Sequence, residues 1–360
     1  MRIYSRHIRN IALLATLMLG GVAAVNAVFD PYQVFHDQFQ SPVRYSTNHR
    51  FQAPGLIRIL LKPGTGYDSV IIGTSMTQNF RPSEVSSLLG WGKTVPLSVS
   101  GGSAEEIRLV LGKALDTGDV KHALVGIFNS YSEQAPALDV GVFPLYLYGG
   151  CPAKYFFNFS TLRAVFEAYL GRGSNWVSDL DTYNLWTQDR RSYNSEANMA
   201  RFRLKLEKTG ERRDPGVGRL QGFPAFDEQL LRLIKAHPDT QFLCFFPPYS
   251  LYYFAAMSKA DFEHIMDFYE HVIEAISQTP NARIFGFDTC FDFTGNLANY
   301  SDETHYRAAM NSAMLGYMAA GRHRLTPGNW PEYRRQLTQA AGDYRLKSDF
   351  DAAGAWAPGL

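Results

Sequence analysis

Residues 67–77, with the sequence YDSVIIGTSMT, decide the fold class of this chain. The first seven residues form a short apolar run typical of a buried strand, and Gly73 permits a tight turn directly after it. Outward from this stretch, predicted strands and helices alternate. Further strands are expected at 95–99, 123–128, 241–246 and 283–287, and helices at 81–89, 103–115, 226–236, 260–276 and from about 305. Such alternation is typical of an α/β fold with a parallel sheet covered by helices.

The composition describes a compact globular protein and argues against several functions. Of 360 residues, 46% are hydrophobic, and 35 Lys+Arg balance 34 Asp+Glu, so we expect no nucleic-acid partner. The three cysteines, Cys151, Cys244 and Cys290, show no CxxC spacing, and at least one is free or pairs with another chain. The sequence has no metal-ligand cluster and no phosphate-binding glycine loop. We therefore expect no metal and no cofactor.

The N-terminal segment, residues 1–29, predicts export from the cytoplasm. Arg2, Arg6 and Arg9 precede an uncharged apolar run over 11–25 that continues weakly to Phe29. This length favours an uncleaved membrane anchor. A cleaved signal peptide is one alternative, with residues 25–27 (VNA) as a loose cleavage site, and a buried core helix is another. In both exported forms the arginines stay on the cytoplasmic side, which places the remaining chain outside the cytoplasm.

The rest of the chain divides into a connector at 30–66, an α/β domain at 67–325 and a C-terminal helix and tail at 326–360. Within the domain, an insertion at about 130–222 interrupts the alternation. Many of its residues are aromatic: Phe143, Tyr146, Tyr148, Tyr155, Phe156, Phe157, Trp176, Tyr183, Trp186 and Tyr193. One interpretation is a small helical subdomain that packs these rings in its core. The other is a lid or carbohydrate-facing wall over the site.

Ser75 is the candidate nucleophile. Ligands of open parallel sheets bind where loops leave the carboxyl ends of the strands, and Ser75 follows the first predicted strand. A serine there can also simply cap the next helix. A nucleophilic serine needs a base to remove its proton and a carboxylate to orient that base.

Asp302 and His305 supply both groups after the last predicted strand. The Asp-x-x-His pattern occurs three times in the chain. The pair at 119 and 122 precedes a strand, and the pair at 261 and 264 lies in the first turns of a helix, where Asp261 has a capping role with Ser258. Position therefore favours Asp302 and His305.

Two segments are candidates for an oxyanion hole, the set of donors that stabilises charge developing in the transition state. Gly101 and Gly102 follow the second strand and precede a helix that the Ser103-x-x-Glu106 capping box opens. Asn129 follows the third strand and carries a side-chain amide. Each feature alone is also an ordinary turn device.

In this order, Gly73-Thr74-Ser75, Gly101-Gly102, Asn129 and Asp302-x-x-His305 resemble the four blocks of the SGNH (GDSL-type) hydrolase superfamily. The N-terminal anchor, the segment 143–148 (FPLYLY) and the segment 246–250 (FPPYS) are similar to its extracytoplasmic branch, which includes alginate O-acetylation proteins and the lipoteichoic acid D-alanylation protein. Two departures are the threonine in Gly-Thr-Ser and the spacing of Asn129 from Gly126.

The resemblance implies a flavodoxin-like three-layer fold and a Ser75–His305–Asp302 triad that transfers or removes acyl groups. The expected protein is an acyltransferase or esterase, anchored in the inner (cytoplasmic) membrane with its catalytic domain in the periplasm. Its substrate would be an O-acyl, most simply O-acetyl, group of a cell-surface or secreted polysaccharide. A membrane-bound O-acyltransferase and polysaccharide synthesis machinery are the implied partners. A periplasmic esterase or lipase for small or lipidic esters, and a non-catalytic accessory protein, are the alternatives.

Overall fold

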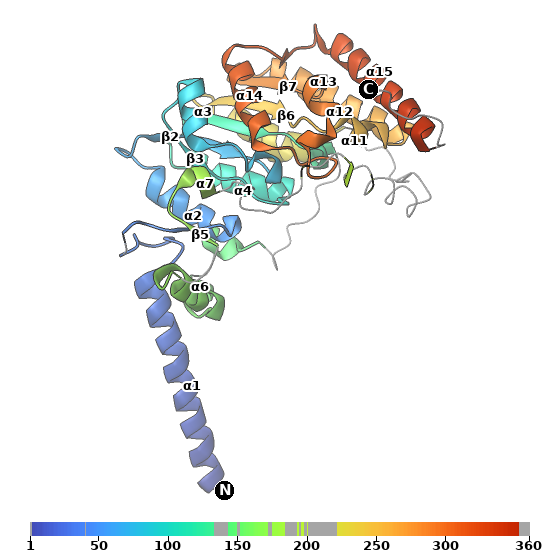
Figure 1. The fold of residues 1–360 in the computed structure, drawn as a ribbon. Coiled ribbons are helices and arrows are strands. Elements are labelled where there is room, and N and C mark those ends of the chain that lie inside the picture. Colours follow the sequence, from blue (N-terminus) through green and yellow to red (C-terminus); the bar gives the residue numbers. More distant parts are fainter. Residues whose placement is uncertain are drawn as a thin grey trace.

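The computed structural model describes residues 2–39, 41–132, 143–149, 152–171, 175–183, 193, 196–197, 200 and 222–352. Figure 1 shows a mixed α/β body from which one long N-terminal helix projects. Six strands form the central sheet, in the order β3-β2-β4-β6-β7-β8. The predicted α/β class with a mostly parallel sheet is confirmed.

Five of the six strands run parallel, and the sixth, at one edge, is antiparallel. The parallel strands are β2 (Tyr67–Ile72), β3 (Lys93–Pro96), β4 (His122–Gly126), β6 (Gln241–Phe246) and β7 (Ala282–Gly286), and the edge strand is β8 (Arg324–Leu325). β3 begins two residues before the predicted strand. The amides of Leu97 and Val99 nevertheless still donate to the carbonyls of Ile71 and Gly73, so the backbone pairing continues beyond β3.

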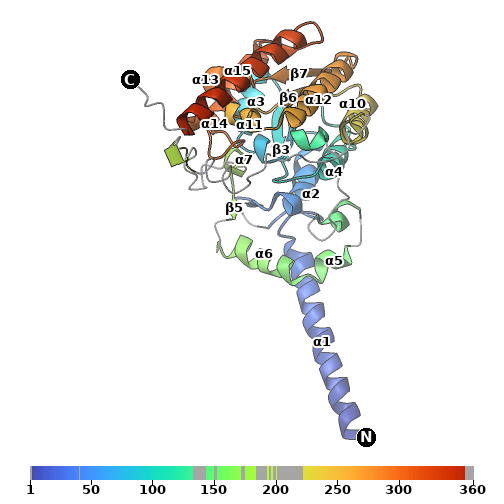
Figure 2. The same cartoon turned by 90° about the vertical axis from the view of Figure 1, so that its right-hand side faces the viewer.

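Helices lie on both faces of the sheet (Figures 1 and 2). The main ones are α3 (Pro82–Leu89), α4 (Ala104–Leu115), α12 (Lys259–Ser277) and α14 (Ala308–Ala319), with α9 (Pro224–Phe226), the π-helical η5 (Asp227–Leu231) and α10 (Arg232–Ala236) forming one further segment. The capping box at the start of α4 is present as predicted. α14 begins three residues later than expected because Tyr306 pairs with Tyr300 in an antiparallel bridge.

The strands are buried from both sides. Val70, Ile71 and Ile72 of β2 have no exposed surface, and neither do Leu124 and Val125 of β4. Strands covered on both faces read as continuous apolar runs, which is why the sequence predicted them.

Residues 30–66, predicted as a connector, contain regular secondary structure and contribute to the core. They contain β1 (Tyr45–Ser46) and the helix α2 (His49–Leu60). Leu56 and Ile57 of α2 belong to the main hydrophobic core. Pro54 and Gly55 are residue types typical of turns, and they concealed this helix in the sequence.

The described part of the insertion forms a second, smaller core together with residues 30–39. It contains η3 (Leu145–Tyr148), α5 (Ala153–Phe156), α6 (Phe159–Tyr169), α7 (Leu180–Tyr183) and β5 (Trp176–Val177), and β5 pairs antiparallel with β1. Tyr155 and Trp176 pack here against Tyr32. These rings therefore have the structural role of the first interpretation. Trp186 lies outside the described residues.

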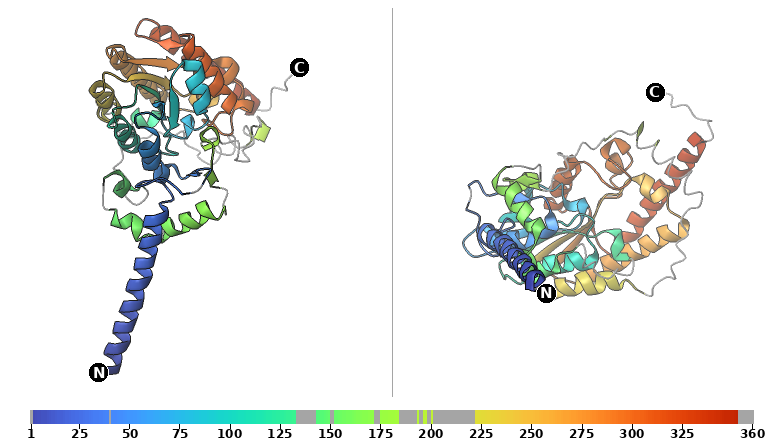
Figure 3. Two further views of the ribbon diagram at one scale, coloured as in Figure 1. Left: turned by 90° about the vertical axis from the view of Figure 1, so that its left-hand side faces the viewer. Right: turned by 90° about the horizontal axis from the view of Figure 1, so that it is seen from below.

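The N-terminal helix α1 (Arg2–Phe29) has 28 residues and projects away from the body (Figures 1 and 3). From Tyr4 to Phe29 it is long and apolar enough for a membrane anchor or a signal sequence. Its last turns are packed against the insertion, where Val22 and Asn26 are buried. The Asn26 side-chain amide donates to the carbonyls of Phe156, at 2.7 Å, and Asn158, at 2.9 Å.

The C-terminal helix α15 (Trp330–Ala352) packs against α12 and against α11 (Leu251–Ala255). It lies at the end of the body remote from α1 (Figure 1). The predicted tail from 353 onward lies outside the described residues.

Candidate active site

Ser75 lies at the carboxyl end of β2, as the sequence predicted, and begins the 3-10 turn η1 (Ser75–Thr77). Gly73 adopts φ +155°, in the region that favours glycine. Thr74, not Ser75, caps this turn, because its side chain accepts from the Met76 amide. The Ser75 side chain is half-buried and free of the capping role that was its alternative.

Thr77 fixes this turn between two strand ends. Its hydroxyl donates to the Thr74 carbonyl at 2.9 Å and bonds the Ser98 hydroxyl at 2.7 Å. Its methyl group fills the space where glycines end β2 and β4. A Cβ atom on Gly73 would lie 2.7 Å from that methyl carbon, and one on Gly126 would lie 2.6 Å from it.

Ser75, His305 and Asp302 form one continuous chain of hydrogen bonds, although 230 positions separate Ser75 from His305. Ser75 Oγ lies 2.9 Å from His305 Nε2. On the other side of the ring, His305 Nδ1 lies 2.7 Å from Asp302 Oδ2. This is the relative arrangement of nucleophile, base and orienting carboxylate that activated serines need.

The loop that carries Asp302 and His305 is held against the sheet at three points. The buried hydroxyl of Tyr300 donates to the Pro248 carbonyl at 2.7 Å. The hydroxyl of Ser250 donates to the Glu303 carbonyl, also at 2.7 Å. The buried hydroxyl of Tyr306 donates to the Met76 carbonyl at 2.8 Å, which ties the residue after His305 to the residue after Ser75. The imidazole therefore has a fixed position relative to the serine.

The Asp302 carboxylate is held in its ionised form. Burial by itself raises the pKa of this group, but the hydrogen bond and charge of His305, with the amides of His305 and Thr304, lower it well below its usual range. Those amides donate to Oδ1 at 2.8 and 2.9 Å, while Oδ2 accepts from the ring. The two oxygens thus have separate roles, one shaping the loop and one orienting His305.

Of the two candidate glycines, only one keeps an available backbone donor. The Gly102 amide donates to the Val99 carbonyl at 2.9 Å, so it is occupied within its own turn, contrary to the predicted oxyanion role. Gly101 has φ +58°, and among the described residues nothing accepts a hydrogen bond from its amide. The same holds for the backbone amide of Ser75, a donor that sequence reasoning overlooked because it looks like any other amide in a sequence.

Asn129 begins the turn η2 (Asn129–Ser132) after β4. Its side-chain amide donates to the Tyr253 hydroxyl at 2.9 Å, so one of its two N–H groups is occupied. Its Oδ1 atom is buried without a hydrogen-bond partner among the described residues. The predicted asparagine is thus half-buried at a strand end, but α11 holds part of its donor capacity.

The other two Asp-x-x-His pairs have the structural roles expected for them. The His122 ring stacks on Trp91 with centroids 4.9 Å apart, at the start of β4. Ser258 caps α12 at Asp261, and His264 bonds the Ser132 carbonyl at 3.0 Å.

The groups that support the trio were not predicted from the sequence. Thr304 donates its amide to Asp302, and its hydroxyl donates to the same carboxylate oxygen at 3.1 Å. Tyr306 and Thr77 act through contacts with distant parts of the chain. Their proximity to His305 and Ser75 in sequence was the only available signal.

A cavity of about 650 Å³ lies elsewhere on the described part of the chain. It is lined by residues including Tyr67, Trp91, Lys93 and Asp181, where β2 and β3 begin. In the insertion's later part, the Tyr193 ring lies 5.1 Å from the guanidinium of Arg307, two positions after His305 in the sequence. Within the described ranges, no group of three or more His, Cys, Asp or Glu side chains is arranged to hold a metal ion.

Comparison of the chain with protein-family models, with curated proteins and with solved structures finds no match. The candidate site is therefore defined by its own geometry, in which a serine is hydrogen-bonded to a histidine and the histidine to an aspartate.

Proposed function

We propose that this chain is an SGNH-type serine acyltransferase or esterase, anchored in the cytoplasmic membrane, that acts on O-acyl groups outside the cytoplasm. The observation that carries the proposal is the chain of hydrogen bonds from Ser75 Oγ through the His305 ring to Asp302. A surface serine without a chemical role needs neither the orienting carboxylate nor a loop tied to its own turn.

In the proposed reaction, His305 Nε2 takes the proton of the Ser75 hydroxyl while Oγ attacks the carbonyl carbon of an ester. Asp302 keeps the Nδ1 proton in place and stabilises the imidazolium that forms. The bond from the acyl carbon to the leaving oxygen then breaks, and His305 returns its proton to that oxygen. The product is an acyl-Ser75 ester, which water or a sugar hydroxyl resolves through the same steps in reverse.

The backbone amides of Ser75 and Gly101, with the second N–H of Asn129, are the proposed donors to the tetrahedral oxyanion. Such donors act on charge that develops in the transition state, and removing one typically costs about 10²–10³ in kcat. The Gly102 amide is left out of this set because Val99 occupies it.

The strand order supports an SGNH-type assignment. Numbered by chain order, the five parallel strands are arranged 2-1-3-4-5, the order of flavodoxin-like sheets. Ser75 follows the first of these strands and Asn129 the third. These two strands flank the point where the winding direction reverses, which is where ligands of such sheets bind.

Two features support a location at the membrane. α1 has the length and apolarity of an anchor, with Arg2, Arg6 and Arg9 at its start. Its last turns are buried against the insertion, which favours the uncleaved form over the cleaved signal peptide. By the positive-inside rule, the catalytic domain would lie in the periplasm.

The acceptor and partners of the proposal rest on the resemblance of the sequence. A polysaccharide hydroxyl would accept the acyl group, and a membrane-bound O-acyltransferase of the polysaccharide synthesis machinery would supply it. Transfer requires that water be kept from acyl-Ser75. The insertion is the proposed cover, since Tyr193 lies against Arg307, two residues after His305.

The test combines p-nitrophenyl acetate as donor with de-O-acetylated alginate as probe acceptor, using the detergent-solubilised full chain. We expect p-nitrophenol release, together with acetylated polymer, that Ser75→Ala abolishes and that Ser87→Ala, an exposed control in α3, preserves. Release without acetylated polymer would favour an esterase. Activity equal in Ser75→Ala and the wild type would overturn the triad, and no activity in either would favour the accessory-protein alternative.

A further inference from the structure

Helix α6 has its small residues inside and its large apolar residues outside. Thr161, Ala164, Val165 and Ala168 are buried. On the opposite side, Phe159, Phe166 and Leu170 are 59%, 53% and 59% exposed, at the spacing that places residues on one helix face. The exposed side of a helix on a globular domain is normally polar. The face also carries the Arg163–Glu167 ion pair, at 2.7 Å, so it is amphipathic, with an unusually large share of exposed apolar side chains.

The same helix lies directly against the end of α1. In Figures 2 and 3, α5 and α6 lie across the last turns of α1, where its projecting part meets the body. Tyr169 of α6 donates its hydroxyl to the Phe29 carbonyl at 2.9 Å, and the two rings lie 5.0 Å apart. Helix α6, with its exposed apolar side chains, thus packs directly against the end of the apolar helix α1.

Further exposed aromatic side chains surround this junction. Phe157, between α5 and α6, is 53% exposed, and Phe35 and Phe39, just after α1, are 43% and 71% exposed. With two residues of α6 and the Leu170 that caps it, they form a set that we call the apolar collar: Phe35, Phe39, Phe157, Phe159, Phe166 and Leu170. Its members come from two distant parts of the sequence and share only their position around the end of α1.

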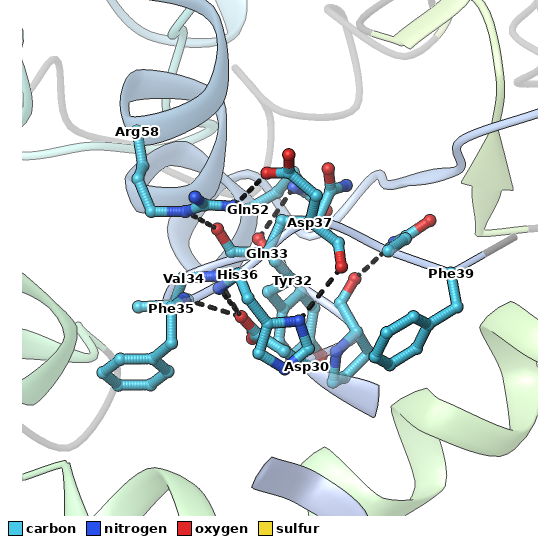
Figure 4. Close-up of polar contacts among 12 residues, drawn as sticks. Asp30, Tyr32, Gln33, Val34, Phe35, His36, Asp37, Phe39, Gln52 and Arg58 are labelled. Atoms are coloured by element: carbon cyan, nitrogen blue, oxygen red, sulfur yellow. Dashed lines mark hydrogen bonds and ion pairs between the residues drawn. The ribbon is translucent and has the colours of Figure 1, made fainter. Parts of the chain in front are cut away.

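The segment that presents Phe35 and Phe39 is held by hydrogen bonds to the Asp30 side chain (Figure 4). The Asp30 carboxylate accepts from the amides of Val34, Phe35 and His36 at 3.1, 2.6 and 2.9 Å. It also accepts from the Tyr155 hydroxyl at 2.6 Å. The Phe35 side chain points away from this polar network (Figure 4), whereas the Phe39 ring lies beside the His36 ring, with centroids 5.6 Å apart. Their exposure is therefore a feature of the folded loop.

The length of α1 places the collar at a bilayer surface. The residues from Asn10 to Phe29, which follow the last arginine of α1, would span about 30 Å as a helix, the thickness of a hydrocarbon core. Phe29 would then lie at the outer edge of that core. Interfacial helices bury apolar faces rich in Trp, Phe and Leu to a depth of about 5–10 Å at this level.

We infer that the apolar collar binds the surface of the lipid bilayer that α1 spans, with α6 lying in the interface. The proposed occupant is the boundary of headgroups and acyl chains in the outer leaflet, into which interfacial helices bury their apolar face. This inference rests on the proposed anchoring of α1. It adds a second attachment, which fixes the tilt of the catalytic domain and its height above the membrane.

The test is depth-dependent fluorescence quenching of the full chain in phospholipid vesicles. An environment-sensitive label is attached to Phe166→Cys or Leu170→Cys in a background without the native cysteines. Leu17→Cys in α1 is the anchoring reference, and Thr338→Cys on α15, remote from α1, is the aqueous control. Phospholipids carry bromine either near the headgroup or near the end of the acyl chain.

We expect bromine near the headgroup to reduce emission roughly twofold at 166 and 170, deep bromine to quench 17 more strongly, and 338 to be unaffected. Quenching at 17 but not at 166 and 170 would overturn the collar and leave the anchor intact. Loss of quenching at all positions would contradict the anchoring itself. Blue-shifted emission at 166 that varies with protein density and not with bromine would assign the face to a second copy and overturn the inference.

Discussion

Asp302 contributes to the site in a way that its charge alone does not describe. Its Oδ2 atom orients the His305 ring, while Oδ1 receives two backbone amides and the Thr304 hydroxyl. An asparagine at this position would keep the bonds that Oδ1 accepts from the two backbone amides and the Thr304 hydroxyl. It would, however, donate to Nδ1 and leave the ring proton on Nε2, where it cannot accept a proton from Ser75.

Asp302→Asn should therefore fold normally and lower kcat for ester hydrolysis by about 10⁴-fold, the size of the loss when a triad aspartate is amidated. Steady-state kinetics with p-nitrophenyl acetate measure the loss, and circular dichroism checks the fold. Asp239→Asn, an exposed substitution in the turn before β6, is the matched control. An Asp302→Asn enzyme within tenfold of the control would contradict the orienting role.

The principal residues of the site could be predicted because each follows a strand. Ser75, Asn129 and the Asp302/His305 loop were located by the rule that ligands of parallel sheets bind at carboxyl ends. The rule cannot say which donors are occupied. That Gly102 donates to Val99, and Asn129 to Tyr253, depends on tertiary contacts that leave no pattern in the sequence.

At the level of elements, the ends of β2 and β4 approach each other through Thr77. A Cβ atom on Gly126 meets the Thr77 methyl carbon at 2.6 Å, and its next neighbour, in Phe245, is 3.5 Å away. Removing that methyl group should therefore relieve the clash, while the serine that replaces Thr77 keeps the hydroxyl bonded to Thr74 and Ser98.

We expect Gly126→Ala to lower the free energy of unfolding by about 1–3 kcal/mol, the usual cost of overpacking, and to reduce esterase activity by displacing the Ser75 turn. The double variant with Thr77→Ser should recover most of both losses. Urea denaturation and p-nitrophenyl acetate hydrolysis measure them. Equal defects in the single and double variants would show that Thr77 does not mediate the effect.

Asp288, after β7, predicts a pH dependence of stability. Complete burial raises the pKa of its carboxyl to about 7, against the opposing hydrogen bonds of the Tyr333 hydroxyl and the Tyr249 amide. The unfolded chain loses this proton near its ordinary value of 3.8, whereas the folded chain keeps it until about pH 7. Folding thus binds a proton in this range, and stability falls as pH rises through it.

Asp288→Asn should flatten this decrease in the free energy of unfolding with pH. The decrease is roughly 4 kcal/mol at most for a pKa shift of this size. Denaturation midpoints at pH 5 and pH 8 measure the difference. Asp239→Asn, whose side chain is exposed, should retain the wild-type slope. A slope unchanged by Asp288→Asn would mean that this carboxyl does not carry the dependence.

The regular elements of the α/β body were the predictable ones, because buried strands and amphipathic helices have periodic patterns. α2 was missed because it contains Pro54 and Gly55. Gly55 is required there by packing, since a Cβ atom would lie 1.8 Å from the Tyr32 carbonyl oxygen. No periodic pattern encodes such an approach between two backbones.

For the molecule as a whole, α1 is part of the folded domain as well as the proposed anchor. Asn26 lies within the loose cleavage motif, yet it is fully buried and bonded to the carbonyls of Phe156 and Asn158. We therefore expect the mature chain in isolated membranes to retain residues 2–27. Intact-mass measurement decides this, and a chain that begins at Val28 would contradict the anchor.

The same contacts predict an effect on stability. Asn26→Leu removes the donor from buried carbonyls and should lower the free energy of unfolding by about 1–3 kcal/mol. Thr16→Leu, an exposed change in the middle of α1, should leave it unchanged. Denaturation of the solubilised full chain compares the two, and equal stability of both variants would show that the last turn of α1 contributes nothing to the domain.

The most direct test of the central claim is peptide mass spectrometry of the full chain after brief incubation with p-nitrophenyl acetate and acid quenching. The proposed triad predicts one acetyl group on Ser75, absent from Ser75→Ala and strongly reduced in His305→Ala. Acetylation elsewhere, or at Ser75 to the same extent without His305, would contradict an activated serine and with it the proposed enzyme.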